Sequence, residues 1–180
     1  ALRATGHETI FDELPDGGRL LDLGCGTGVP YDAHLVRSGY QVTGVDFAEK
    51  HLRAAREQVP DATFYRCDIA DFEPRSGGYD GLRSLYALFH LPKDEHASII
   101  SKMAGPLRTG GVLLITLGTG EREAVDSDWC GAEMAWASLA PDTYEELLAE
   151  AGFEIIHDTY EGDPGADEHH WWVLARRASR

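Results

Sequence analysis

Short apolar segments alternate with helical patterns along most of this 180-residue chain, and this alternation limits the possible folds more than any other feature. Helical spacing of apolar residues occurs at 48–59 and 94–104, and another helix is predicted to begin at Pro141. Between the helical patterns lie five short segments, rich in Leu or β-branched residues, that have the form of buried strands: 19–23, 41–46, 62–68, 81–85 and 111–117. Repeated strand–helix units predict an α/β sandwich of three layers, with helices on both faces of a parallel sheet.

The last third of the chain departs from this pattern. Strands are predicted at 153–160 and 171–176, and the Gly-, Asp- and Pro-rich segment between them has no helical pattern. A connection without a helix favours antiparallel pairing, so we expect a mixed sheet at that edge. Because no repeat or linker interrupts the chain, we expect residues 1–180 to form a single domain. The chain begins at Ala1 without a methionine, which leaves open a truncated N-terminus.

Acidic residues are concentrated in one part of the chain. The formal net charge is −15, and residues 121–168 hold fifteen acids against a single base, Arg122. Such a field repels polyanions and argues against nucleic acid as a partner, while a solvated acidic face and a site for cationic ligands both stay open. No apolar run has the length of a membrane span, and the three cysteines lack a metal-binding or disulfide-framework spacing. We expect a cytoplasmic protein with a small-molecule partner and no metal.

The segment from Leu20 to Gly28 reads LLDLGCGTG and carries the strongest functional signal. A predicted buried strand runs directly into three alternating glycines, and a helix is predicted to begin near Tyr31. Glycines at such a turn let the backbone approach a ligand closely, and the helix N-terminus offers N–H donors. The third glycine comes one residue too early for the GxGxxG pattern of dinucleotide sites, and the lysine of a P-loop is missing. The loop therefore favours a nucleoside without a pyrophosphate.

This loop resembles motif I of the class I S-adenosylmethionine-dependent methyltransferases, and the resemblance extends from about Leu20 to Arg176. The family implies a Rossmann-like, seven-stranded, mostly parallel sheet of order 3-2-1-4-5-7-6 with an antiparallel last strand. It also implies S-adenosylmethionine as cofactor and methyl transfer to a small-molecule O, N or S nucleophile. Further family landmarks recur in order: Asp46 at the end of the second strand, CDI at 67–69, the segment 80–92, and LRTGG at 107–111.

Two other functions stay open beside this one. One is a domain that binds the same cofactor without catalysing transfer. The other is a nicotinamide-dependent reductase on a similar sheet, which the glycine spacing disfavours.

The resemblance assigns the cofactor contacts residue by residue. Asp22 would orient the loop or meet the cofactor's amino group. Asp46 would accept hydrogen bonds from the ribose hydroxyls, although an Asp at this position can also cap the following helix. Phe47 would lie against the adenine or pack in the core. Asp68 and the N–H of Ile69 would meet the adenine unless they form a plain turn. The remaining expected cofactor residues are Gly24, Cys25, Gly26, Gly28 and Leu85.

The acceptor site is expected where the fourth predicted strand ends, because the family shapes its active site there. Tyr86 and His90 are the candidate catalytic residues, and His90 would be a general base or a packing or capping residue. The segment lacks the paired prolines typical of enzymes that methylate amide or nucleobase nitrogens. The connection 126–140 contains Trp129 and Trp136, which would form a substrate lid or cover the sheet edge.

Overall fold

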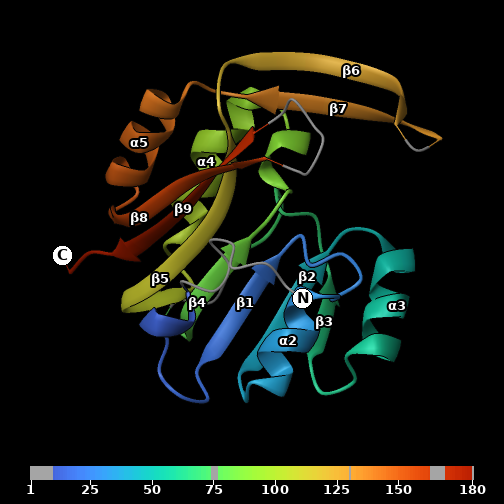
Figure 1. Ribbon diagram of the computed structural model, residues 1–180, viewed down its shortest axis with the longest axis vertical. Coiled ribbons are helices and arrows are strands. Elements are labelled where there is room, and N and C mark those ends of the chain that lie inside the picture. The colour runs from blue at the N-terminus through green and yellow to red at the C-terminus, as the bar shows by residue number, and fades with distance from the viewer. Residues whose placement is uncertain (1–9, 74–76, 130, 163–168, 180) are drawn as a thin grey trace.

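The computed structural model describes residues 10–73, 77–129, 131–162 and 169–179. Its centre is a seven-stranded sheet in the order β3-β2-β1-β4-β5-β9-β8 (Figure 1). The first five strands pair in parallel, and β9 pairs antiparallel with both β5 and β8. The strands of this sheet are β1 (Arg19–Leu23), β2 (Gln41–Asp46), β3 (Thr63–Arg66), β4 (Tyr79–Ser84), β5 (Leu107–Gly118), β8 (Phe153–Gly162) and β9 (His169–Arg177).

Counted within this sheet alone, the strand order is 3-2-1-4-5-7-6 with an antiparallel last strand, as the sequence predicted. The labels run higher because β6 (Arg122–Trp129) and β7 (Ala132–Ser138) form a separate antiparallel hairpin. The connection predicted over 126–140 therefore consists mostly of β-hairpin, which the sequence analysis did not predict, and its role as a substrate lid stays a prediction. The acidic side chains of β6 obscure the alternation of apolar residues by which a strand is recognised.

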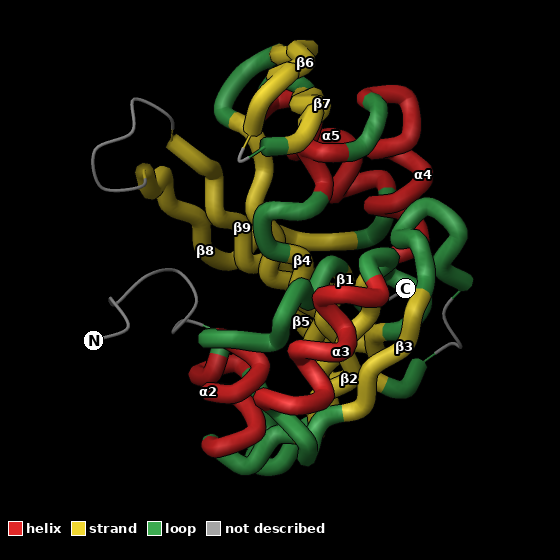
Figure 2. Tube along the Cα trace, turned by 90° about the vertical axis from the view of Figure 1, so that its right-hand side faces the viewer, coloured by secondary structure: helices red, strands yellow, loops and turns green. Residues whose placement is uncertain are grey.

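Helices cover both faces of the sheet, in three layers (Figures 1 and 2). The helices α4 and α5 pack on one face, whereas the 3₁₀ helix η1 and α2 pack on the other, where α3 lies against α2 and β3. The bounds of these elements are η1 (Phe11–Glu13), α2 (Tyr31–Arg37), α3 (Glu49–Gln58), η2 (Leu88–His90), α4 (Lys93–Met103) and α5 (Pro141–Glu150).

The two faces of β5 contribute to two separate cores. Leu113 and Ile115 face α4 and α5, whereas Val112 and Leu114 face η1 and α2. A strand covered on both sides needs apolar residues at every position, which explains its continuous apolar run. In the same way, Trp171 and Trp172 are buried on opposite faces of β9.

One helix buries a different face from the one expected. The sequence predicts Ala97, Ile100 and Ala104 as the inner face of α4, but Ala97 is exposed. The buried residues of this helix are His96, Ile99, Ile100 and Met103. Larger apolar side chains stabilise the fold more on burial than alanine does, and His96 can be buried because both of its ring nitrogens have partners.

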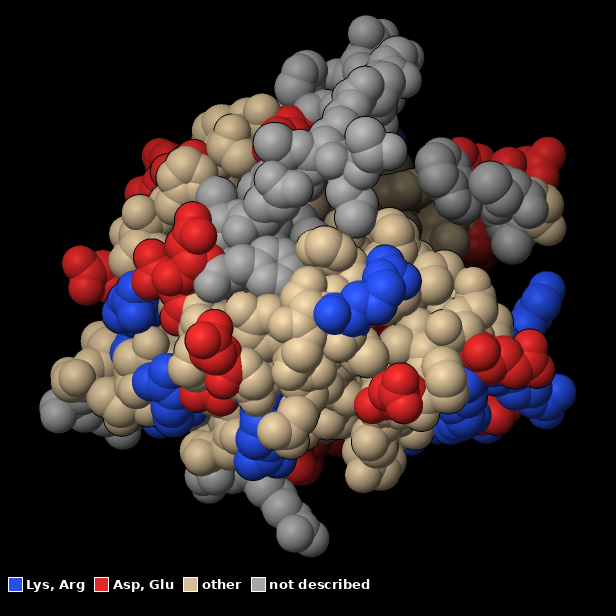
Figure 3. All heavy atoms as spheres, turned by 60° about the horizontal axis from the view of Figure 1, so that its bottom comes forward, with Lys and Arg blue, Asp and Glu red and all other residues tan. Residues whose placement is uncertain are grey.

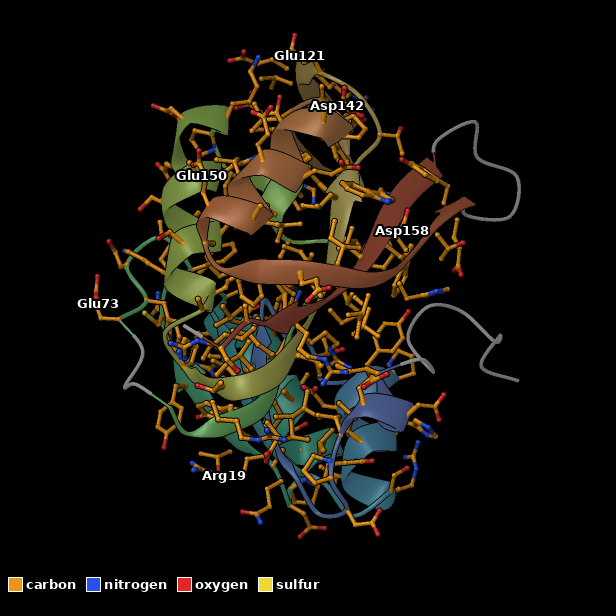
Figure 4. All side chains as sticks on the ribbon, turned by 90° about the vertical axis from the view of Figure 1, so that its left-hand side faces the viewer. Arg19, Glu73, Glu121, Asp142, Glu150 and Asp158 are labelled. Atoms are coloured by element: carbon orange, nitrogen blue, oxygen red, sulfur yellow. The ribbon has the colours of Figure 1, made fainter. Side chains whose placement is uncertain are left out.

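The acidic side chains of the last third lie mainly at the surface. Glu121, Asp142 and Glu150 are exposed and point away from the body of the protein (Figure 4). Asp158 is also exposed, and its carboxylate accepts a hydrogen bond from Nε1 of Trp171 at 2.8 Å. On the face at the bottom of Figure 1, acidic and basic side chains are interspersed (Figure 3). None of the helices in the described ranges is long and apolar enough to cross a membrane.

A buried hydrogen-bond network joins α4 and α5 at the base of the hairpin. Nε2 of His96 donates to the carbonyl of Leu91 at 3.0 Å, so Nδ1 accepts from the Tyr144 hydroxyl at 2.9 Å. The same hydroxyl accepts the N–H of Leu139 at 3.2 Å. Burial lowers the pKa of His96, which keeps the imidazole in the neutral form that this network requires.

We expect Tyr144→Phe to lower the free energy of unfolding by about 1–3 kcal/mol. Loss of the hydroxyl leaves two buried polar groups, Nδ1 of His96 and the N–H of Leu139, without this partner. Urea denaturation of the variant and the parent chain measures the difference. Tyr160→Phe is the control, because Tyr160 is 53% exposed. Equal effects of the two substitutions would contradict the role given to this network.

Candidate cofactor and acceptor site

The glycine loop between β1 and α2 is held against the end of β2. The backbone N–H groups of Gly24 and Cys25 donate to the carbonyl of Val45 at 2.8 and 3.1 Å. The N–H of Gly26 donates to Oδ2 of Asp46 at 2.9 Å. The loop therefore has a defined shape at the carboxyl edge of the parallel strands, the edge where open α/β sheets bind ligands.

The three glycines of this loop have different steric surroundings. A Cβ atom on Gly24 would lie 2.7 Å from Cβ of Ala87, and one on Gly28 would lie 3.1 Å from Cγ2 of Val59. A side chain at either position would crowd its neighbour, and both glycines also have a positive φ, +83° and +72°. A Cβ atom on Gly26 would meet nothing within 4 Å, and its φ of +55° belongs to the left-handed region that favours glycine. Gly26 is thus the loop glycine that faces open space.

Asp46 lies at the end of β2 and is only 6% exposed. Its Oδ2 accepts the N–H of Gly26, and its Oδ1 accepts the N–H of Ala48 at 2.8 Å, at the start of α3. This bond turns the chain just before α3, whose N-cap residue is Ala48 and which has no side-chain cap, so Asp46 does not cap the helix as the alternative predicted. Each carboxylate oxygen has a second acceptor position, so ribose hydroxyls can still bind here. The ribose role stays a prediction.

The predicted adenine contacts lie beside this acid and past the end of β3. Phe47 is 69% exposed, so the alternative that it packs in the core is wrong. Oδ1 of Asp68 accepts the N–H of Ala70 at 3.0 Å, as in the predicted plain turn. Ile69 packs against the main core next to the glycine loop. Stacking of adenine on Phe47 and its hydrogen bonding near Asp68 stay predictions.

Sequence reasoning missed a buried ionic cluster beneath the loop. Arg83 of β4 is 1% exposed, and its Nη2 contacts Oδ2 of Asp22 and, at 2.5 Å, Oδ1 of Asp32. The ring of Tyr31 lies 5.2 Å from the guanidinium carbon. Asp22 therefore lies near the glycine loop and is also paired with Arg83. A charged residue inside the apolar segment 81–85 is the signal that could have identified the cluster.

A small cavity of about 60 Å³ lies beside this cluster. Five of its lining residues belong to the predicted cofactor set and come from β1, the loop and the end of β4: Asp22, Gly24, Cys25, Gly28 and Leu85. The structure therefore brings these residues together around one space, along with Arg83 and Tyr86.

Cys25 lines the cavity without having the properties of a nucleophile. Burial raises the pKa of its thiol, and the charges of Asp22, Asp32 and Asp46 raise it further. A neutral thiol is a weak nucleophile, which agrees with its interpretation as a small loop residue. Within the described ranges, no three His, Cys, Asp or Glu residues are grouped to hold a metal ion.

The predicted acceptor residues lie in an aromatic cluster where β4 ends. Tyr86 has a φ of +54°, and its N–H donates to Oγ1 of Thr116 at 2.6 Å. Its ring contacts His170 edge-on at a centroid distance of 5.0 Å. Phe89 stacks on Trp136 at 5.6 Å, and the His90 ring lies 4.6 Å from Trp136. Residues distant in sequence, from η2, β7 and β9, therefore meet at one place.

The β6–β7 hairpin closes over this cluster (Figures 1 and 2). Nδ1 of His90 is 3.1 Å from the carbonyl of Ala135, so the hairpin is bound to η2. A cavity of about 330 Å³ lies between them, lined by Phe89, Trp136 and His170 among others. Tyr86 and His90 do not line this cavity themselves, but their rings contact residues that do. The predicted substrate residue Trp129 pairs through its backbone with Ala132, and its side chain lies outside the described part of the structure.

Comparison with known proteins agrees with this geometry. Residues 20–111 match a family model described as a methyltransferase domain. A trans-aconitate 2-methyltransferase from Variovorax paradoxus is 31% identical over 173 residues, which cover 86% of this chain and 65% of the relative. The chain thus spans just under two thirds of that relative's length.

Two solved structures share the fold. A methyltransferase from Methanosarcina mazei has a TM-score of 0.83 at 19% identity, covering 96% of this chain and 98% of that one. A 1,6-didemethyltoxoflavin-N1-methyltransferase from Burkholderia thailandensis, solved with bound 1,6-didemethyltoxoflavin and S-adenosylhomocysteine, has a TM-score of 0.77 at 19% identity, covering 97% of this chain and 77% of that one. With the matched domain model and the ordered motifs, the chain belongs to the class I S-adenosylmethionine-dependent methyltransferase family.

Proposed function

We propose that this chain binds S-adenosylmethionine at the glycine loop and transfers its methyl group to a small-molecule acceptor. The observation that carries the proposal is the open space in front of Gly26, in a loop whose other two glycines lie against neighbouring side chains. The buried carboxylate of Asp46 adjoins that space and has acceptor positions suited to ribose hydroxyls. The relatives named above are methyltransferases, one named for trans-aconitate, which supports a small acceptor.

Methyl transfer requires the protein mainly to position the acceptor relative to the cofactor. S-adenosylmethionine supplies a methyl group already activated on a sulfonium, so the chain must hold the acceptor in line and exclude water. Tyr86 is suited to a place between the cofactor and the acceptor. It lines the cavity of about 60 Å³ beside the glycine loop, and its ring contacts His170, which lines the cavity of about 330 Å³ at the hairpin. The aromatic rings around it also tolerate a cationic sulfonium.

The hydrogen bond that His90 makes with Ala135 suits the proposed role of a general base. A backbone carbonyl can only accept a hydrogen bond, so Nδ1 carries the proton in the contact with Ala135. In the neutral imidazole this leaves a lone pair on Nε2, which can take a proton from an oxygen or nitrogen acceptor. A thiolate acceptor would not need this step.

We expect Tyr86→Phe, His90→Ala and Trp136→Ala to lower methyl transfer much more than they weaken S-adenosylmethionine binding. Their rings adjoin the proposed acceptor cavity, whereas the ribose contact is assigned to Asp46. Turnover and calorimetric affinity are measured for each variant, with melting temperature as a check on folding. Tyr65→Phe, on β3 and 58% exposed, is the control. Full activity of all three variants would place the acceptor elsewhere.

Two measurements separate this function from the alternatives. Calorimetric titration with S-adenosylmethionine and with NAD distinguishes a methyltransferase site from a nicotinamide site. Turnover against a panel of small acids, amines and thiols then distinguishes an enzyme from a domain that only binds the cofactor. Binding of NAD in preference to S-adenosylmethionine would refute the proposal.

A further inference from the structure

Two carboxylates and one guanidinium share a buried site beneath the glycine loop. Asp22 is 4% exposed, Asp32 is fully buried, and Arg83 lies between them. Both acids contact the same nitrogen, Nη2 of Arg83, so their carboxylates are neighbours. With both acids ionised, the cluster would carry one uncompensated negative charge in a low-dielectric environment, which is costly.

The hydrogen bonds of the cluster are incomplete. Oδ2 of Asp32 and both Nε and Nη1 of Arg83 are buried without a hydrogen-bond partner among the described residues. Burial and the neighbouring charge of Asp22 raise the pKa of Asp32 to about 9. One proton is therefore held by the pair of acids at neutral pH, as in other carboxylate pairs that share a site.

The cavity beside the cluster is sized for a small polar group. Its volume of about 60 Å³ suits an ammonium group or a few water molecules rather than a nucleoside. Asp22 and Arg83 line it on one side, and Gly24, Leu85 and Tyr86 connect it to the glycine loop and the end of β4. A cation entering this space would stabilise the second negative charge of the acid pair.

We propose that Asp22 and Asp32 form a proton-releasing receptor for the ammonium group at the amino-acid end of the cofactor. This rests on the proposed cofactor site. When the ligand's ammonium binds beside Asp22, the proton held by the acid pair passes to solvent. Two carboxylates then face two cations, the ammonium and Arg83, and the buried charge is balanced. Asp32 is a positioning residue, because it affects the cofactor only through Asp22 and Arg83.

Other titratable groups lie near the acid pair, and protons released by them must be distinguished from the proton of the pair. The raised pKa of Cys25 in the loop keeps its thiol neutral at pH 7, and the raised pKa of Arg83 on β4 keeps its guanidinium charged. The second candidate proton source is His51 on α3, whose Nδ1 lies 3.7 Å from Oδ1 of Asp46. A ribose bound at Asp46 would disturb that contact, so His51→Gln is the necessary control.

Calorimetry in buffers of different ionisation enthalpy counts the protons released on binding. The probe is S-adenosylhomocysteine at pH 7, where its amino group is largely protonated. We expect release of about one proton with the parent chain and with His51→Gln, and about none with Asp32→Asn. 5′-Methylthioadenosine, which lacks the amino-acid end, should release none from the parent chain.

The affinity for S-adenosylhomocysteine should also rise up to about tenfold from pH 6 to pH 7. A proton released on binding makes the affinity increase with pH below the pKa of the unliganded pair. Asp32→Asn should have a flat profile over this range. If Asp32→Asn does not fold, the contrast between the two ligands on the parent chain still tests the proposal.

Three results would overturn the inference: binding of S-adenosylhomocysteine without proton release, equal release with 5′-methylthioadenosine, or full release by a folded Asp32→Asn. Binding without proton release would result if the ligand's own carboxylate paired with Arg83. The charge of the ligand's ammonium would then be balanced while the acid pair kept its proton. Failure of both S-adenosylmethionine and S-adenosylhomocysteine to bind would instead refute the proposed function. The two failures are therefore distinguishable.

Discussion

Gly26→Val is expected to weaken S-adenosylmethionine binding by at least about 100-fold while the chain still folds. The valine side chain would occupy the open space in front of the loop, where the cofactor is proposed to lie against the backbone. A branched side chain there prevents close approach, and the loop cannot retreat because its N–H groups are bound to Val45 and Asp46. Calorimetric titration measures the loss.

A matched variant separates this loss of binding from backbone strain. Gly39 also has a positive φ, +91°, and a Cβ atom there would meet nothing within 4 Å. It lies between α2 and β2, outside the proposed site. Gly39→Val should therefore cost a similar 1–2 kcal/mol of conformational strain and leave cofactor binding intact. If Gly26→Val binds the cofactor as well as Gly39→Val does, the loop has a structural role only.

Asp46→Ala is expected to weaken cofactor binding about 10- to 150-fold. This corresponds to about 1.5–3 kcal/mol for hydrogen bonds to a charged group, at about 1.4 kcal/mol per factor of ten. The substitution removes the proposed ribose acceptor and also the partner of the Gly26 N–H, so both effects act in the same direction. Affinity for S-adenosylmethionine and for S-adenosylhomocysteine should fall equally, since both carry the same ribose.

The control for this variant is another carboxylate with a backbone partner. Asp80 accepts the N–H of Arg19 at 2.8 Å and pairs with Arg108 at 2.6 Å, at the start of β4. These contacts hold its pKa below the usual value for an aspartate. Asp80→Ala should lower stability without affecting cofactor affinity. Unchanged affinity in a folded Asp46→Ala variant would exclude the ribose assignment.

The strand and helix pattern could be predicted because each element repeats one local rule. Doubly covered strands require continuous apolar runs, and amphipathic helices show apolar residues at helical spacing, so β1 and β2 have the predicted bounds. The hairpin was missed because its first strand, β6, is rich in acidic residues and because contacts with other elements hold the hairpin in place. Trp136 stacks on Phe89 of η2, and Ala135 binds His90, about 45 residues earlier in the chain.

The sequence by itself determined the sheet, the glycine loop and the acids at the strand ends, because short motifs with fixed spacing place these features at one edge of a parallel sheet. Only the tertiary structure decided which glycine faces open space, since that depends on Ala87 and Val59 beside the other two. It also decided that Arg83 lies between Asp22 and Asp32, three residues from three elements. The apolar neighbours of Arg83 indicate that its charge is buried, but which acids pair with it depends on how the three elements pack.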